Sequence, residues 1–320
     1  MTSVRRFCRA VAPLSVLLAC RPESDSIVSG LLADRFASSE WSEPVNLGPV
    51  INSSAVESNA GLSSDAHTLF FVSTRAGGLG NLDIWMSHRR CLACDWEAPV
   101  NLGAPINSDA IDAAPTMSED GRLLFFYSAR AGGIGLGDVY VSHRVSTGAD
   151  GDVWGPPVNL GPDVNTAANE QGSFYVHEPA EPNAFVYFNR PTAGGSLDIY
   201  RVAVSNDGDA LGPAVLVPEL SDPTATDQKV AVSADGHELL LSSMRAGGFG
   251  NFDIWRFTRQ SAQDPWSNPT NLDAPINTPD LDSQPVLSRD GRTLIFTSIR
   301  TGGHGAQDLW MSTRRPGGQL

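Results

Sequence analysis

Five carboxylates recur at one fixed place in this 320-residue chain, and their type and spacing could carry chemistry. Each stands sixteen residues after a tryptophan or, once, a leucine: Glu57, Asp112, Glu170, Asp227 and Asp282. Carboxylates grouped around one point must pair with arginines, water or a cation, because like charges repel. Glycoside hydrolases instead use two or three unlike carboxylates. The pattern therefore leaves open an acid–arginine lattice and a cation or polar-ligand site.

The other reactive side chains indicate no catalytic centre. Cys91 and Cys94 form a lone C-x-x-C in RRCLACDW, which in an exported protein predicts a local disulfide. A zinc site would need two more ligands, and a thioredoxin-type motif would need a βαβ context. None of the six histidines accompanies a nucleophile motif of the G-x-S-x-G kind. We expect no catalytic residue here and no cofactor beyond a bound cation.

These positions belong to a unit of about 55 residues that is repeated five times. In every copy an arginine begins a glycine-rich string and an aspartate follows eight residues later. The pairs are Arg75 and Asp83, Arg130 and Asp138, Arg190 and Asp198, Arg245 and Asp253, and Arg300 and Asp308. Because they recur in every copy, we expect them to tie the loop, by an ion pair or by aspartate bonds to loop amides. The glycines would supply positive φ angles, including the one five residues after each arginine.

Each unit predicts four short strands. Segments such as TLFFVSTR (68–75) and LDIWMSHR (82–89) are rich in β-branched and aromatic residues, and Ser-x-Asp-Gly turns separate strands. A second string recurs as WSEPVNLGPVIN, WEAPVNLGAPIN and WGPPVNLGPDVN. Across residues 41–320 the repeats resemble the WD40-like β-propeller repeat of the TolB family; a linear solenoid is the alternative. The resemblance implies an all-β, five-bladed β-propeller with four-stranded blades. The orphan copy WSEPVNL (41–47) would then close the last blade and remove an exposed edge.

In such a propeller the five acids begin the innermost strands and ring one mouth of the central channel. The Arg-Gly-Gly loops lie on the same face. The third copy departs from the others, because FYVHEPAEPNAFVYFNR (174–190) lacks the Ser-x-Asp-Gly turn. Its aromatic residues are Phe174, Tyr175, Tyr187 and Phe188. They are either drift or an interaction patch, since aromatic residues are enriched at interface anchors.

The N-terminus predicts export. Three arginines precede a short apolar stretch that ends in LLAC at Cys20, too short to span a bilayer and typical of a signal. The ending resembles the bacterial lipobox, which implies a lipidated cysteine; the alternative is an ordinary signal peptide. The domains would be a signal peptide (1–19), a lipidated cysteine and tether (20–40) and the propeller (41–320). By resemblance to enterobacterial sorting, Arg21 favours the outer membrane.

Composition excludes other classes of partner. The formal net charge is −14 and the isoelectric point about 4.7, which argues against nucleic acid, because phosphate binding needs a basic surface. No run approaches 18 apolar residues, so a lipid anchor would be the only link to a membrane.

The sequence therefore predicts a lipid-anchored envelope propeller that acts as a non-catalytic platform for protein or ligand binding. By resemblance to TolB, its partners would be other envelope proteins, among them peptidoglycan-associated lipoproteins. The alternative is a carbohydrate-active propeller, similar to glycoside hydrolases, that uses the carboxylates at the channel mouth.

Overall fold

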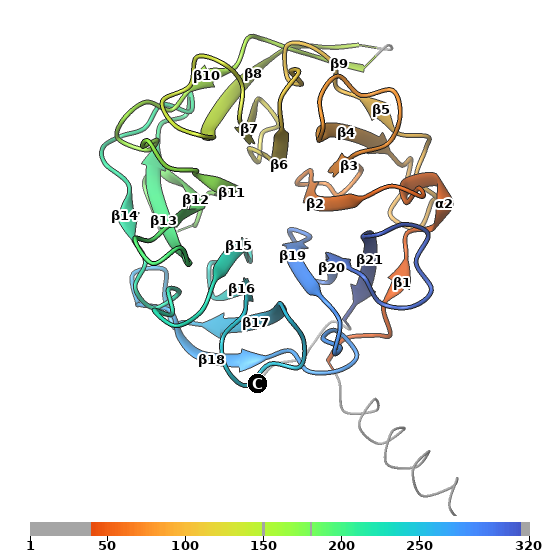
Figure 1. Cartoon of the computed structure of the whole chain (residues 1–320), viewed down its shortest axis with the longest axis vertical. Helices are drawn as coiled ribbons and strands as arrows, with labels where there is room; N and C mark the ends of the chain where they lie inside the picture. The colour runs from red at the N-terminus through yellow and green to blue at the C-terminus, as the bar shows by residue number, and fades with distance from the viewer. Residues whose placement is uncertain (1–39, 149–150, 180, 315–320) are drawn as a thin grey trace, which may run out of the picture. The chain divides into compact units, whose positions relative to one another are not determined.

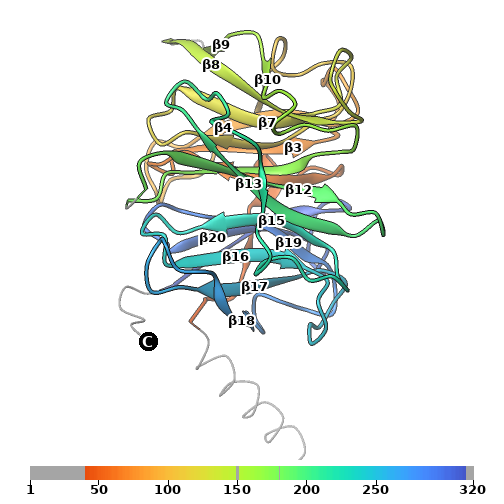
Figure 2. The ribbon, with the colours of Figure 1, turned by 90° about the vertical axis from the view of Figure 1, so that its left-hand side faces the viewer.

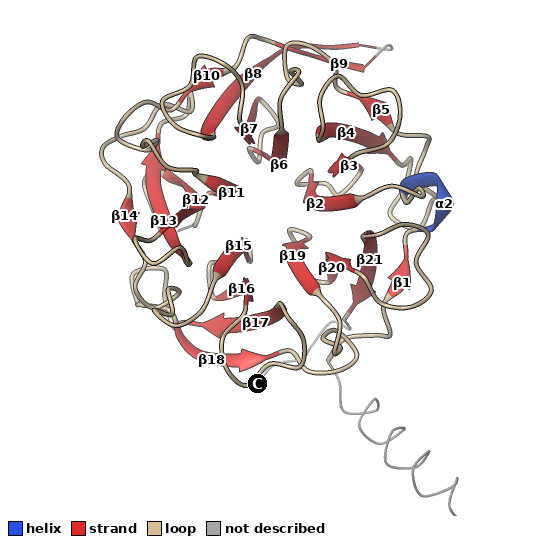
Figure 3. Cartoon of the chain, viewed as in Figure 1, coloured by secondary structure: helices blue, strands red, loops and turns tan. Residues whose placement is uncertain are grey.

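The computed structural model describes residues 40–148, 151–179 and 181–314, and these form a five-bladed β-propeller (Figure 1). The predicted all-β fold is confirmed, since the five antiparallel sheets surround a central channel. Figure 3 shows one short helix, α2 (Gly48–Ile51), at the outer edge. The predicted signal peptide, Cys20 and most of the tether lie outside the described residues.

Each blade is built from consecutive strands, and the innermost strand comes first in the chain. Blade 1 holds β2 (Glu57–Leu62), β3 (Thr68–Ser73), β4 (Asp83–His88) and β5 (Val100–Asn101). Blade 2 holds β6 (Asp112–Met117), β7 (Leu123–Ser128), β8 (Asp138–Gly148) and β10 (Val158–Asn159), and β9 (Gly151–Trp154) extends β8 as a hairpin. Blade 3 holds β11 (Gln171–Val176), β12 (Ala184–Pro191), β13 (Leu197–Val204) and β14 (Val215–Leu216). Blade 4 holds β15 (Asp227–Val232), β16 (Glu238–Ser243), β17 (Asp253–Thr258) and β18 (Ser267–Asn271).

The last blade joins the two ends of the propeller. It holds β19 (Asp282–Leu287), β20 (Thr293–Ser298) and β21 (Asp308–Thr313), and its outer strand is β1 (Val45–Asn46). Val45 lies opposite Met311, and Trp41 forms a further bridge with Arg314. The N-terminal segment therefore closes the ring as predicted, although its regular ladder is only two residues long.

The core lies between the blades, because each sheet is covered on both faces. Phe70 and Phe71 are neighbours on β3 and point to opposite faces, yet both are fully buried. The side view shows the sheets packed face to face (Figure 2). This explains why the second strands are continuous apolar runs rather than alternating ones.

Every innermost strand contains a β-bulge just inside the channel mouth. The ladder with the second strand shifts register within Ser58–Gly61 in blade 1, and the other four blades shift at the equivalent place. Asn59, Ala114, Gly172 and Gln284 at these bulges have positive φ. A bulge re-aims side chains and often lies beside functional sites.

Two further features lie away from the channel. Cys91 and Cys94 are joined by a disulfide with an S–S distance of 2.13 Å, in the loop between β4 and β5. In the described part of the chain, no helix has the length and apolar character needed to cross a membrane.

Candidate functional site at the channel mouth

The five ring acids form an internal network of ion pairs with the repeated arginines, which we call the lattice. Each is fully buried and forms an ion pair with the repeated arginine of its own blade. Asp112 is representative: it accepts from Arg130 at 2.8 Å, from the Ser108 amide at 2.6 Å and from the Ser128 hydroxyl at 2.5 Å. Each arginine also donates to a backbone carbonyl and lies over an aromatic ring, as Arg130 does over Tyr140 at 5.2 Å.

These ion pairs indicate that the ring acids have a structural role. Their oxygens accept from the preceding loop and from residues at or just after the end of the second strand, and their side chains are fully buried. Among the described residues, no group of three or more His, Cys, Asp or Glu side chains could hold a metal ion. Because removing one partner of a buried ion pair costs roughly 3–5 kcal/mol, these pairs stabilise the mouth rather than offer it a reactive group.

In four blades the repeated aspartate caps the glycine-rich loop. Asp83 accepts from the amides of Leu79 and Gly80 and from the Asn101 side chain. Asp138, Asp253 and Asp308 make the equivalent bonds. The structure thus separates the expected roles: the aspartate holds the loop, while the arginine pairs with the ring acid.

In four blades the glycine five residues after the arginine is required for a reason other than the positive φ angle that the sequence predicts. Positive φ occurs instead two residues after the arginine, as at Gly77. At Gly80 an added Cβ would lie 1.9 Å from the Ala110 carbonyl oxygen of the next blade. The glycine is therefore required by the close approach of two loops across a blade interface. In blade 3 alone, Gly195 has positive φ and no such neighbour.

Blade 3 leaves its aspartate uncapped. Its ladder continues to Pro191 opposite Leu197, so the loop spans only residues 192–196. That shorter loop closes on itself through Thr192 and Ser196 and brings no amide to Asp198. The outer strand has Leu216 where blade 1 has Asn101. Asp198 Oδ1 is consequently buried without a hydrogen-bond partner in the described structure.

Two effects act on the pKa of the Asp198 carboxyl. Burial, and next the charge of Asp227, raise the pKa of the Asp198 carboxyl above its ordinary value. A raised pKa is what a proton-donating carboxyl needs near neutral pH. The sequence preserves the aspartate in all five copies, and only the shortened loop and the lost asparagine distinguish this one.

A cavity of about 190 Å³ lies in the channel beneath the mouth, and five amide residues line it beside apolar ones such as Leu82 and Ile111. The amides are Asn59, Gln171, Asn189, Gln228 and Gln284, and Tyr127 and Lys229 add a phenol and an amine. Three of these side chains, Asn59, Lys229 and Gln284, come from the bulges, two residues after a ring acid. Sequence reasoning missed them because it sought residues shared by all copies, whereas these positions differ between copies.

Asn189 carries an unused acceptor into this cavity. The residue is 2% exposed, and its Oδ1 has no hydrogen-bond partner among the described residues. Buried polar atoms are nearly always paired in native proteins. An orphaned acceptor in a polar cavity therefore marks a place where a ligand hydroxyl or a water donates.

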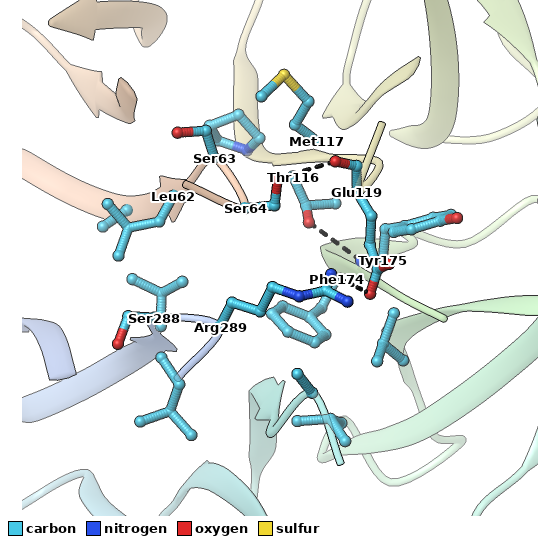
Figure 4. Close-up of a pocket in the computed structure, with 18 of the residues that line it drawn as sticks. Leu62, Ser63, Ser64, Thr116, Met117, Glu119, Phe174, Tyr175, Ser288 and Arg289 are labelled. Atoms are coloured by element: carbon cyan, nitrogen blue, oxygen red, sulfur yellow. Dashed lines mark hydrogen bonds and ion pairs between the residues drawn. The ribbon is translucent and has the colours of Figure 1, made fainter. Parts of the chain in front are cut away.

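A second, smaller cavity of about 80 Å³ lies at the opposite mouth, among turns between first and second strands (Figure 4). Phe174 points into it, and Arg289 spans it to an ion pair with Glu119 at 2.8 Å. Tyr175 stacks on Phe125, whereas Tyr187 and Phe188 are at most 1% exposed. The four aromatic residues proposed as an interaction patch therefore do not form one exposed surface.

The divergent turn of blade 3 has a structural role. It inserts Glu178, which is fully buried, into an ion pair with Arg259 of blade 4. Arg201 and Tyr187 extend this polar cluster. The lost Ser-x-Asp-Gly turn is thus replaced by a tie between two blades.

Comparison with known proteins supports the fold and changes the functional expectation. No protein-family model matches the chain, and no curated protein matches it. An endo-arabinase from Bacteroides thetaiotaomicron superposes with a TM-score of 0.60 at 16% identity, over 84% of this chain and 98% of that one. An α-L-arabinofuranosidase from Lactobacillus brevis gives 0.59 at 13% identity, over 83% and 92%. A TolB from Acinetobacter baumannii gives only 0.47 at 16% identity, over 82% and 55%.

The expectation of a non-catalytic, TolB-like platform that is no enzyme is therefore wrong. The finding against it is that the structures with TM-scores of 0.57–0.60 are glycoside hydrolases, although at 12–16% identity this likeness itself shows the fold alone. The error has a physical origin. The repeated residues that carry the TolB resemblance form the ion-pair lattice and loop caps, and such scaffold residues report architecture rather than the chemistry of a site.

Proposed function

We propose that this chain is a carbohydrate-active propeller, similar to glycoside hydrolases, that takes a sugar residue into the amide-lined cavity of its channel. The observation that carries the proposal is the lining itself: five amide side chains surround about 190 Å³. Sugar hydroxyls both donate and accept hydrogen bonds, and so do amides. The unpaired Oδ1 of Asn189 supplies an acceptor that only a ligand or a water can satisfy.

We assign the proton-donating role in glycosidic bond cleavage to Asp198. It is the second residue of the third strand in the same blade as Asn189, and it lies opposite Arg190 in the ladder. Its carboxyl is the one repeated aspartate of the described blades without loop amides, and its pKa is raised by burial and by Asp227. The proposal thus places the reaction at the one blade junction where the lattice is interrupted.

Substitution of Asn189 by leucine tests the binding site. Because Asn189 Oδ1 has no protein partner, the variant should keep the melting temperature of the wild type but lose calorimetric binding of arabino-oligosaccharides. Asn107→Leu is the matched control: Asn107 is equally buried, but it bonds both backbone groups of Ile84. The control should lose stability, by roughly 1–3 kcal/mol for each group left unpaired. Retained sugar binding by Asn189→Leu would contradict the proposed site.

Hydrolysis is tested separately with Asp198→Asn. Release of reducing ends from arabinan and xylan should fall at least a hundredfold, in keeping with the usual contribution of a general acid. Binding of the oligosaccharide should persist, because the amide cavity is intact. Full activity of this variant would remove Asp198 from the mechanism while leaving the binding proposal standing.

We further propose that a lipid on Cys20 holds the propeller at the outer membrane of the bacterial envelope. The support is the LLAC ending and the polar tether that follows it. A carbohydrate-active domain held there would meet polysaccharides outside the cytoplasm.

A further inference from the structure

Lys229 spans the centre of the channel and is the single lysine of the chain. It occupies the bulge of β15 in blade 4, and its Nζ donates to the Ala60 carbonyl of β2, in blade 1, at 2.5 Å. Figure 1 shows that β19 of blade 5 lies between these two inner strands. The side chain lines both the mouth cavity and the smaller cavity at the other end. Lys229 therefore forms the floor between the two.

This amine has no anionic partner in the described structure. It is 1% exposed, and none of the ion pairs between described residues includes it. Glu57, Asp227 and Asp282 are each held by an arginine of their own blade. Glu238 of β16 pairs with Arg314, Arg190 of β12 with Glu170, and Arg201 of β13 bonds Tyr187. Glu119, which lines the smaller cavity together with Lys229, pairs with Arg289.

We infer that Lys229 recognises a carboxylate, and that the sugar bound in the mouth cavity is a uronic acid. This deepens the proposed function and rests on it. An ammonium has three donors, and the structure engages one of them. A carboxylate would pair the charge and accept from the others, whereas a neutral sugar would leave a buried charge uncompensated.

The surrounding chemistry favours a carboxylate over a phosphate. The floor offers one cation. Arg289, the arginine that lines the smaller cavity with it, already pairs with Glu119, so a second negative charge would find no free arginine among the described lining residues. The net charge of −14 opposes any anion at long range, but this field is screened over about 10 Å at 0.1 M salt. The amides above the floor would bind the hydroxyls of the same ring, so the sugar as well as the carboxylate is recognised.

Calorimetry on the full chain at pH 6 separates recognition of the carboxylate from recognition of the sugar hydroxyls. Glucuronate should bind about tenfold more tightly than glucose, the difference between a charge-assisted and a neutral hydrogen bond. Acetate and glucose 6-phosphate should bind more weakly than glucuronate. In Lys229→Met, glucuronate and glucose should bind equally. Equal binding of the two sugars by the wild type, or tighter binding of acetate or of glucose 6-phosphate, would overturn the inference while glucose binding upholds the proposed function.

Nuclear magnetic resonance of the wild type provides a second measurement that needs no variant. With lysine labelled at Cε, the single lysine gives one signal. Burial lowers the pKa of Lys229 to about 7, so the signal should titrate near neutrality. Glucuronate should move the midpoint up by at least one pH unit, because the carboxylate favours the charged amine, and glucose should leave it in place. An unchanged midpoint with saturating glucuronate would refute the contact, whatever the variant does.

Discussion

Asparagine substitutions at two equivalent aspartates should differ in their effect on the free energy of unfolding. Asp253 accepts from the Phe249 amide at 2.5 Å, from the Gly250 amide at 3.2 Å and from Asn271 at 2.9 Å. Hydrogen bonds to a charged group contribute roughly 1.5–3 kcal/mol each. An asparagine keeps one acceptor oxygen and turns an NH₂ toward a donor. Asp253→Asn should therefore lower the free energy of unfolding by about 2–4 kcal/mol.

Asp198→Asn should cause no loss of stability at pH 7. Its Oδ1 has no donor to lose, and a neutral amide avoids the cost of burying charge. Because the folded protein raises the pKa of Asp198, ionisation of this group opposes folding above that pKa. The opposition disappears as the pH falls below the ordinary value of 3.8. Any increase in the free energy of unfolding of Asp198→Asn over the wild type should therefore be present at pH 7 and absent at pH 3.

Urea unfolding followed by tryptophan fluorescence measures both variants, at pH 7 and at low pH. The midpoint for Asp253→Asn should fall, while that for Asp198→Asn should stay or rise. If Asp198→Asn loses as much stability as Asp253→Asn, then Asp198 is capped like its equivalents, and the assignment of a free carboxyl fails. If Asp253→Asn loses nothing, the loop amides do not depend on the carboxylate.

Three further predictions concern the scaffold and the anchor. Asp112→Ala should cost roughly 3–5 kcal/mol, because the largely buried Arg130 loses its only anionic partner in the described structure. Thermal unfolding would be compared with a surface control such as Asp109→Ala, and a difference near zero would show that the lattice is unimportant. Deletion of residues 40–47 should remove the outer strand of the last blade. Gel filtration should then report self-association through the exposed edge of β21. A monomer of native stability would argue against strand closure. Cys20→Ala should move the protein from the membrane to the soluble fraction of a bacterial host, unless the anchor lies elsewhere.

The fold could be predicted from the sequence because its main constraints are repeated. Five copies of one unit define the blades, and the extra copy at residues 41–47 shows where the ring closes. The acid spacing left open an acid–arginine lattice between adjacent blades, whereas Glu57 pairs with Arg75 of its own blade. Repetition averages out chance, so even single-sequence reasoning identifies residues that every blade needs.

The candidate site could not be found by the same reasoning, because it consists of differences between copies. Asn59 and Lys229 hold equivalent bulge positions, but nothing in the spacing shows that a bulge turns them into the channel. Asp198 holds the same repeat position as Asp253, but its loop reads PTAGGSL rather than AGGFGNF, and the longer ladder leaves that loop shorter. Contacts across a blade interface decide such cases, and they depend on three-dimensional register.

The interruptions of the lattice converge on the junction of blades 3 and 4. The string that contributes asparagines elsewhere has decayed there: the Ile199 amide bonds Ser221, where the Ile84 amide of blade 1 bonds Asn107. A purely structural repeat would be expected to repair such losses by restoring an asparagine. Instead, the junction keeps an uncapped carboxyl at Asp198 and an unpaired cation at Lys229, both of which oppose folding. Lys229 lines a polar cavity, and a buried group that costs stability beside such a cavity is better explained by a ligand than by drift. The binding site is therefore to be sought there rather than in the symmetric ring of acids.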